Sequence, residues 1–265
     1  MSLRVMTWNL WWHFGPWEAR QRLIVDTIRE VDPDVLCVQE VWSDEAHDQL
    51  DDLASALDFR AARTEPIFYS GQSFGNAVLS RWPVDRLADE VLPRADGSPS
   101  HRRVVAASIE TPFGPWPFAS THLDHRFDRS ADRVAQIRRV MELAREWRGD
   151  PDEDVPVIVG ADLNAVPDTD EIRMATGRTA GVDGIVFSDT WEQAGSGSGH
   201  TWLRECPYSA DSAWPDRRLD YVLVSWPRPK PIGNPIRTWT VGHGGDDDVW
   251  PSDHLAVVAD VSTGG

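Results

Sequence analysis

Residues 155–167 have the sequence Val-Pro-Val-Ile-Val-Gly-Ala-Asp-Leu-Asn-Ala-Val-Pro, in which a short apolar run opens onto two polar side chains. The Val and Ile residues are typical of a buried strand, and the run is too short for a helix. Gly160 and Ala161 let the backbone approach a neighbouring element closely. Asp162 and Asn164 are two residues apart, so they can point the same way from the strand end. A turn is an equally good explanation, because Asp and Asn also satisfy backbone groups in turns.

Similar strand ends recur along the chain. Apolar patterning predicts strands over residues 3–9, 34–39, 66–80 (as a hairpin), 84–92, 103–110, 116–121, 219–225 and 254–261, and helices over residues 18–31, 44–57 and 128–147. Residues 168–199 are expected to be irregular. The polar residues at the strand ends are Asn9, Glu40, His122, Asp162, Asn164, Asp220, Asp253 and His254. If the strands form stacked sheets that share one rim, these side chains converge. Oxygen ligands with two imidazoles and no thiolate suit Mg²⁺ or Mn²⁺ better than a structural zinc.

The charge of the chain limits its partners. The 26 basic and 43 acidic residues give a net charge of −17, so the average surface repels a long polyanion. Lys230 is the only lysine and lies between two prolines, which excludes Schiff-base chemistry and a phosphate-binding Gly-Lys-Ser/Thr loop. Arginine must therefore carry any recognition of anions.

Length and cysteine content indicate a single domain in a reducing compartment. The 265 residues contain no linker, and we expect one domain over residues 1–265. Cys37 and Cys206 have no paired spacing, so neither a disulfide framework nor a cysteine metal site is indicated. No signal-peptide pattern is evident, and the longest uncharged stretch, residues 66–80, is too short and too polar to span a membrane. We expect a cytoplasmic protein and leave its oligomeric state open.

An ordered set of motifs spans nearly the whole chain. They are residues 7–10 (Thr-Trp-Asn-Leu), 38–41 (Val-Gln-Glu-Val), 75–81 (Gly-Asn-Ala-Val-Leu-Ser-Arg), 120–123 (Ser-Thr-His-Leu), 160–164 (Gly-Ala-Asp-Leu-Asn), 218–221 (Arg-Leu-Asp-Tyr) and 252–254 (Ser-Asp-His). This set resembles the endonuclease/exonuclease/phosphatase superfamily, which has the deoxyribonuclease I-like fold. The resemblance implies an α+β fold, a four-layered α/β sandwich in which two packed, mostly antiparallel β-sheets are flanked by helices. The motifs would then line one edge.

The same resemblance implies a metal-dependent phosphoesterase. Its metal ligands would be Glu40, Asn9 and Asp253. Asp162 would align or deprotonate the attacking water, although a free aspartate, with a pKa of about 3.9, is a weak base. Asn164 would hold this water or a phosphoryl oxygen.

The remaining matched positions imply contacts to the substrate. His122 and His254 would donate hydrogen bonds to phosphate oxygens, and Asp220 or Asp253 would orient His254. Asn76, Arg103 and Asp124 are predicted to bind substrate, although capping of the helix that follows, or solvation, is the default explanation for Asp124. Such donors, with a metal, stabilise the negative charge that builds up on phosphoryl oxygens during ester cleavage.

Several alternatives stay open. The arginines are scattered among acids, which favours a small, lipid-like or nucleotide phosphate ester over DNA or RNA, but a metal-dependent nuclease remains the main alternative. Residues 122–125 (His-Leu-Asp-His) match half of a zinc-hydrolase signature, whose leading histidine is replaced by Ser120. A catalytically inactive binding protein of the same fold is a third alternative. Residues 246–248, three aspartates, would bind a second cation or form a solvated acidic loop.

Overall fold

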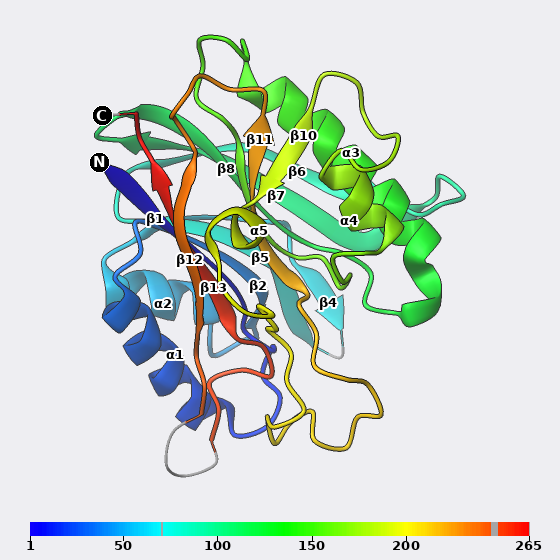
Figure 1. The fold of residues 1–265 in the computed structure, drawn as a ribbon. Coiled ribbons are helices and arrows are strands. Elements are labelled where there is room, and N and C mark those ends of the chain that lie inside the picture. Colours follow the sequence, from blue (N-terminus) through cyan, green and yellow to red (C-terminus); the bar gives the residue numbers. More distant parts are fainter. Residues whose placement is uncertain (70, 245–248, 265) are drawn as a thin grey trace.

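The chain folds into two β-sheets packed face to face, with helices on the outer face of each (Figure 1). The computed structural model describes residues 1–69, 71–244 and 249–264. These layers form the deoxyribonuclease I-like α/β sandwich that the sequence predicts. The acidic residues 246–248 lie outside the described residues. No helix among the described residues is long and apolar enough to cross a membrane.

The first sheet has the strand order β12-β13-β1-β2-β5-β3, with β4 paired to β5. Its β1–β2 pair is parallel, and its other strand pairs are antiparallel. Helices α1 and α2 pack on its outer face. These elements are β1 (Ser2–Asn9), α1 (Trp17–Val31), β2 (Val35–Ser43), α2 (Gln49–Leu57), β3 (Arg60–Arg63), β4 (Ile67–Tyr69), β5 (Gln72–Ser80), β12 (Pro235–Val241) and β13 (Ala256–Ser262).

The second sheet has the strand order β10-β11-β9-β8-β7-β6. Its β8–β9 pair is parallel, and its other strand pairs are antiparallel. Helices α3 and α4 cover its outer face. These elements are β6 (Val84–Pro93), β7 (Pro99–Thr111), β8 (Gly114–His122), the 3₁₀ turn η1 (Phe127–Arg129), α3 (Ser130–Arg148), β9 (Ile158–Asp162), α4 (Asp170–Ala175), β10 (Val186–Asp189), α5 (Thr190–Ala194) and β11 (Asp220–Trp226).

Each sheet contains one parallel strand pair joined by a crossover helix. Helix α1 connects β1 to β2, and α3 connects β8 to β9. The carboxyl ends of two parallel strands meet at the same sheet edge, so Asn9 ends β1 beside Gln39, and His122 ends β8 beside Asp162. The antiparallel neighbours β11 and β13 begin at these edges, which places Asp220 opposite Asp162. The topology therefore brings the polar strand ends of both sheets to one edge of the sandwich.

The two sheets approach each other closely at Gly160. A Cβ atom built on Gly160 would lie 2.5 Å from the Cβ of Cys37 and 3.0 Å from that of Thr7, so any side chain there would push the sheets apart. Along β1, Val5 belongs to the core between the sheets, while Met6 packs outward beneath α1. This alternation follows the two-residue period of a strand and explains why β1 is apolar on both faces.

Several parts of the chain differ from the sequence-based prediction. The segment predicted to be irregular contains α4, β10 and α5, whose short lengths gave too little periodicity to recognise. Helix α2 begins at Gln49 rather than near residue 44, because the side chain of Asp48 accepts hydrogen bonds from the N–H groups of Leu50 and Asp51 and caps the helix. Strand β12 is an additional element that the sequence analysis missed.

Both cysteines are buried free thiols. Cys37 lies between the sheets, where burial raises the pKa of its thiol to about 12, and burial also raises the pKa of Cys206. Because the thiolate is the reactive form, we expect the native protein to resist alkylation by iodoacetamide. Mass spectrometry should find both cysteines unmodified in the native protein and both alkylated after denaturation in guanidinium. Rapid native labelling of Cys37 would contradict this packing of the sheets.

Candidate active site

The side-chain direction of Glu40 is set by a β-bulge in β2. The register between β2 and β5 shifts between Val38 and Val41, and Glu40 has a φ of 56°, in the left-handed region. This conformation costs a non-glycine residue about 1–3 kcal/mol and is most often retained where function requires it. The bulge turns the carboxylate of Glu40 toward the strand ends of the second sheet, where its Oε1 lies 3.8 Å from His122 Nδ1.

Asp162 lies at the centre of the gathered strand ends. Its Oδ2 accepts a hydrogen bond of 2.9 Å from Asn9 Nδ2, and its Oδ1 accepts one of 2.9 Å from the backbone N–H of Asn164. The Asn9 side chain is itself fixed, because its Oδ1 accepts the N–H of Trp11 at 2.9 Å. Asp162 is only 1 % exposed, so a carboxylate from the second sheet is tied beneath the surface to an amide from the first.

His122 joins Asp162 to Glu40. Its Nε2 lies 3.4 Å from Asp162 Oδ2 and 2.9 Å from Asn164 Nδ2. Asn164 Nδ2 also donates to the carbonyl oxygen of Leu123, so the amide nitrogen is the donor and His122 Nε2 the acceptor. Burial and the positive charge of Arg102 lower the pKa of His122 well below its ordinary value. The ring is therefore neutral at pH 7, with its proton on Nδ1.

His254 is oriented by Asp220. Its Nδ1 donates to Asp220 Oδ2 at 2.8 Å, and its Nε2 lies 3.9 Å from Asp162 Oδ2. Thr201 Oγ1 donates to the same Asp220 oxygen at 2.6 Å. Of the two acids predicted as partners of His254, it is thus Asp220 that contacts the ring.

The carboxylates of the site are buried close to one another. Burial raises the pKa of Glu40 to about 7, and the nearby charge of Asp253 adds to this effect. Burial and the charge of Asp220 raise the pKa of Asp162 to about 6, and burial also raises that of Asp253. This concentration of negative charge favours a bound cation.

The pKa of His254 shifts in the opposite direction to that of His122. Burial acts to lower the pKa of His254, but the carboxylates of Asp220 and Asp162 outweigh this effect and raise it well above the ordinary value. His254 therefore keeps its proton at neutral pH, and its Nε2–H is a charged donor beside Asp162. The site thus combines one neutral and one protonated imidazole.

Carboxylate and imidazole atoms of Asp162, Asp220 and His254 lie within 4.8 Å of one another. Asp220 Oδ1 is buried without a hydrogen-bond partner among the described residues. The negative charges of Asp253 and Asp162 both raise the pKa of Glu40, so the Glu40 carboxylate lies near both. The oxygen-rich donor set fits Mg²⁺ or Mn²⁺.

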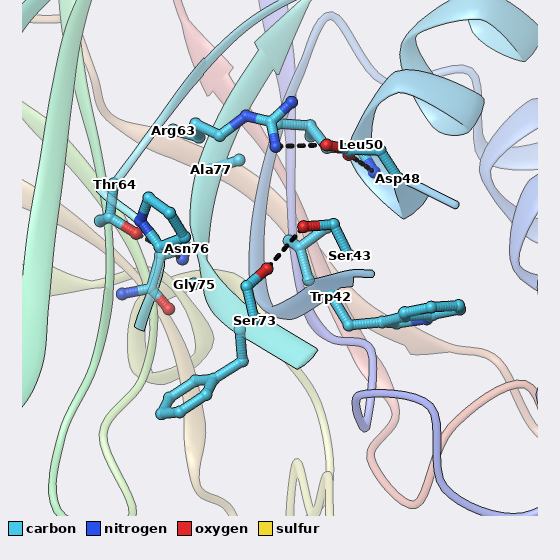
Figure 2. A pocket seen from close by; sticks show the side chains of 13 residues that line it. Trp42, Ser43, Asp48, Leu50, Arg63, Thr64, Ser73, Gly75, Asn76 and Ala77 are labelled. Atoms are coloured by element: carbon cyan, nitrogen blue, oxygen red, sulfur yellow. Dashed lines mark hydrogen bonds and ion pairs between the residues drawn. The ribbon is translucent and has the colours of Figure 1, made fainter. Parts of the chain in front are cut away.

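The three residues predicted to bind substrate make contacts of their own. Asn76 Nδ2 donates to the carbonyl oxygen of Arg103, and Arg103 Nε donates to Asp89 Oδ1 at 2.8 Å. Asp124 Oδ1 accepts the backbone N–H of Arg126. Figure 2 shows Asn76 beside Thr64, whose Oγ1 accepts the N–H of Asn76, at one wall of a hollow between β2 and β5. Their contact with substrate stays a prediction.

Two supporting residues were missed by the sequence analysis. Gln39 Nε2 reaches Ser120 Oγ at 3.0 Å and so links the sheets directly beneath the site. Arg20 of α1 is 1 % exposed and donates to carbonyl oxygens of the loop after Asn9 and to that of Pro251 at 2.9 Å. Arg20 lies four residues before Ile24, at a position of the buried face of α1. An arginine at a position of the apolar helix face was the feature of the sequence that could have indicated a buried, hydrogen-bonded role for Arg20.

Comparison of the sequence with protein-family models assigns the chain to a family. The model of the Endonuclease/Exonuclease/phosphatase family matches residues 6–254. The chain belongs to this family. The matched region begins before Asn9 and ends at His254, so it contains the whole cluster around Asp162. Membership supports phosphoester hydrolysis as the class of reaction.

Solved structures and a curated relative agree with this assignment. The structure of D. rerio TDP2 complexed with a single-strand DNA product matches this chain with a TM-score of 0.76 and 19 % sequence identity. The match covers 98 % of this chain and 99 % of the TDP2 chain. The human Nocturnin catalytic domain with bound sulfate has a TM-score of 0.74 and 22 % identity, covering 98 % and 93 %. At these levels of sequence identity, both similarities are evidence for a shared fold alone. Protein angel of Drosophila melanogaster is 24 % identical over 208 residues, which are 72 % of this chain and 57 % of that protein.

Proposed function

We propose that this protein is a divalent-metal-dependent hydrolase that cleaves phosphate esters of small, lipid-like or nucleotide substrates. The observation that carries the proposal is the cluster around Asp162, in which Asn9 from one sheet and His122, Asn164 and His254 surround a single buried carboxylate. Family membership supports the same class of reaction.

Glu40, Asn9 and Asp253 would hold the metal. Glu40 and Asp253 are neighbouring, half-buried carboxylates, and the strained backbone of Glu40 directs its side chain into the cluster. A divalent cation there would polarise a phosphoryl oxygen and stabilise the charge that develops during cleavage. The zinc-hydrolase alternative has less support, because His125 Nδ1 accepts a hydrogen bond from Arg102.

The protein side chains would divide the remaining chemistry. Asp162, with its pKa raised by burial, would accept a proton from water more readily than a free aspartate and would position that water. His254 would offer its charged Nε2–H to a phosphoryl oxygen, while Asp220 keeps the ring in place. Neutral His122 would add the N–H at its Nδ1 as a further donor, and the amide of Asn164 would hold this ring by donating to its Nε2.

The net charge of −17 supports a compact substrate over a long nucleic acid. TDP2 of the same fold has been solved with a single-strand DNA product, which keeps a nuclease as the second candidate. A substrate panel separates the two. It would compare bis-p-nitrophenyl phosphate, p-nitrophenyl phosphate, nucleotides and inositol phosphates with plasmid DNA, each with Mg²⁺, Mn²⁺ or EDTA.

We expect turnover of a small ester with Mg²⁺ or Mn²⁺ and its loss in EDTA. The Glu40→Gln variant should reduce kcat by at least about 100-fold, because it weakens the main metal-holding carboxylate. Glu45→Gln, which removes an exposed carboxylate a few residues later, is the matched control and should keep wild-type activity. Full activity in EDTA or in Glu40→Gln would refute the metal proposal, and plasmid cleavage as fast as the best small substrate would refute the substrate preference.

A further inference from the structure

A second cleft opens beside the cluster around Asp162. Its walls include Asn76, Arg102 and His122, and it encloses about 210 Å³, counting the solvent at its mouth. Thr64 and Asn76 line both this cleft and the hollow of Figure 2, so the two adjoin along β5. His122 contacts Asp162 and also lines the cleft, so the cleft adjoins the reacting centre without coinciding with it.

Arg102 supplies the positive charge of this cleft. Arg102 and Arg103 of β7 both line the cleft, but the guanidinium of Arg103 pairs with the carboxylate of Asp89 at 2.8 Å. The guanidinium of Arg102 donates instead to His125 Nδ1 at 3.0 Å. Within the described residues, no carboxylate lies in ion-pair contact with Arg102 at 4.0 Å or less.

His125 orients Arg102 without neutralising it. Arginine can only donate, so Nδ1 of His125 must accept and the ring must be neutral at that nitrogen. Burial and the charge of Arg102 lower the pKa of His125, which agrees with a neutral ring. A carboxylate in the place of His125 would compete with an incoming anion, whereas the imidazole leaves the positive charge available. The remaining N–H groups of the guanidinium have the planar geometry that matches phosphate oxygens.

We propose that this cleft is a subsite for a second phosphate group of the substrate. Arg102 binds this phosphate, and His125 positions the guanidinium of Arg102. The inference rests on the proposed function, because the ester bond that is cleaved must lie at Asp162. It narrows the substrate to a compound that carries a further phosphate next to the phosphate under attack. Two sources share this chemistry: a nucleotide with phosphates at both its 3′ and 5′ positions, and an inositol bisphosphate.

Paired substrates test the subsite. The first pair is thymidine 5′-(p-nitrophenyl phosphate) with and without a 3′-phosphate, and the second is an inositol bisphosphate and its monophosphate. We expect the wild-type protein to prefer the doubly phosphorylated member of one pair, which identifies the source. Arg102→Gln should lower kcat/KM for that member by about 10–100-fold, mainly through KM, because a charged hydrogen bond is lost. The singly phosphorylated member should keep most of its rate.

Two further variants complete the design. His125→Ala should reduce the preference for the doubly phosphorylated substrate by a smaller factor, through a higher KM. Arg126→Gln removes an exposed charge from the same loop and is the matched control, with an unchanged preference expected. An unchanged preference in Arg102→Gln, or no preference in the wild-type protein, would overturn the subsite.

A binding measurement separates this inference from the proposed function. Isothermal titration of the EDTA-treated protein with inorganic phosphate should detect binding in the wild-type and Arg126→Gln proteins and little or none in Arg102→Gln. If no phosphate ester is hydrolysed but phosphate binding depends on Arg102, the proposed reaction fails and the anion subsite stands. If esters are hydrolysed but phosphate binding does not depend on Arg102, the reaction stands and the subsite fails.

Discussion

Replacement of Asp162 by asparagine should lower kcat by about 100–10,000-fold, the usual contribution of a group that takes a proton during the reaction. The substitution keeps the size of the side chain but removes its charge. Both oxygens of Asp162 accept hydrogen bonds, one from Asn9 and one from the N–H of Asn164. An amide NH₂ group in either position would therefore face another donor. Steady-state kinetics with the best ester of the panel measures the effect.

The matched control for this prediction is Asp168→Asn, which removes an exposed carboxylate in the loop that follows β9. It should keep the kcat and KM of the wild-type protein. Circular dichroism of Asp162→Asn should show an intact fold, so that lost activity reports on chemistry. A folded Asp162→Asn protein with most of the wild-type kcat would exclude Asp162 from the proposed role.

Replacement of Arg20 by methionine should lower the free energy of unfolding by roughly 3–5 kcal/mol, because several buried carbonyl groups lose charged hydrogen bonds. The guanidinium donates to the carbonyl oxygens of Leu10, Trp11, Trp12, Phe14 and Pro251. Burial lowers the pKa of Arg20 to about 10, so the side chain remains charged at neutral pH. Thermal melting should show a fall in Tm on the order of 10 °C.

Arg20 also connects two parts of the candidate site. The loop that it holds follows Asn9, and Pro251 directly precedes Ser252, whose Oγ donates to the carbonyl oxygen of Asn9 at 2.6 Å. Arg22→Met is the matched control, because Arg22 is exposed on the same helix, and its effect should stay within about 0.5 kcal/mol. Equal melting temperatures for the two variants would show that the buried hydrogen bonds contribute little to stability.

The amino-acid sequence was enough to predict the sandwich fold and the polar residues that gather at its rim. Strands such as residues 3–9 carry local patterns of apolar residues, and several predicted strands have a polar motif residue at one end. The sandwich itself was predicted from the resemblance of these motifs to a known superfamily. The close approach expected at Gly160 is confirmed, because a Cβ atom built there would lie only 2.5 Å from the Cβ of Cys37. These features were accessible because they depend on neighbours along the chain or on the size of one residue.

Other features depend on register and on contacts between distant segments, and only the tertiary structure decided them. Arg103 pairs with Asp89 while Arg102 donates to His125, because adjacent residues of a strand point to opposite faces and the sequence does not say which face is inside. The bulge at Glu40 and the contact of His254 with Asp220 follow from how strands pair, and Arg20 meets its partners only when α1 packs against two loops. A sequence pattern is periodic along one chain, whereas each of these contacts joins segments whose relative placement the whole fold determines.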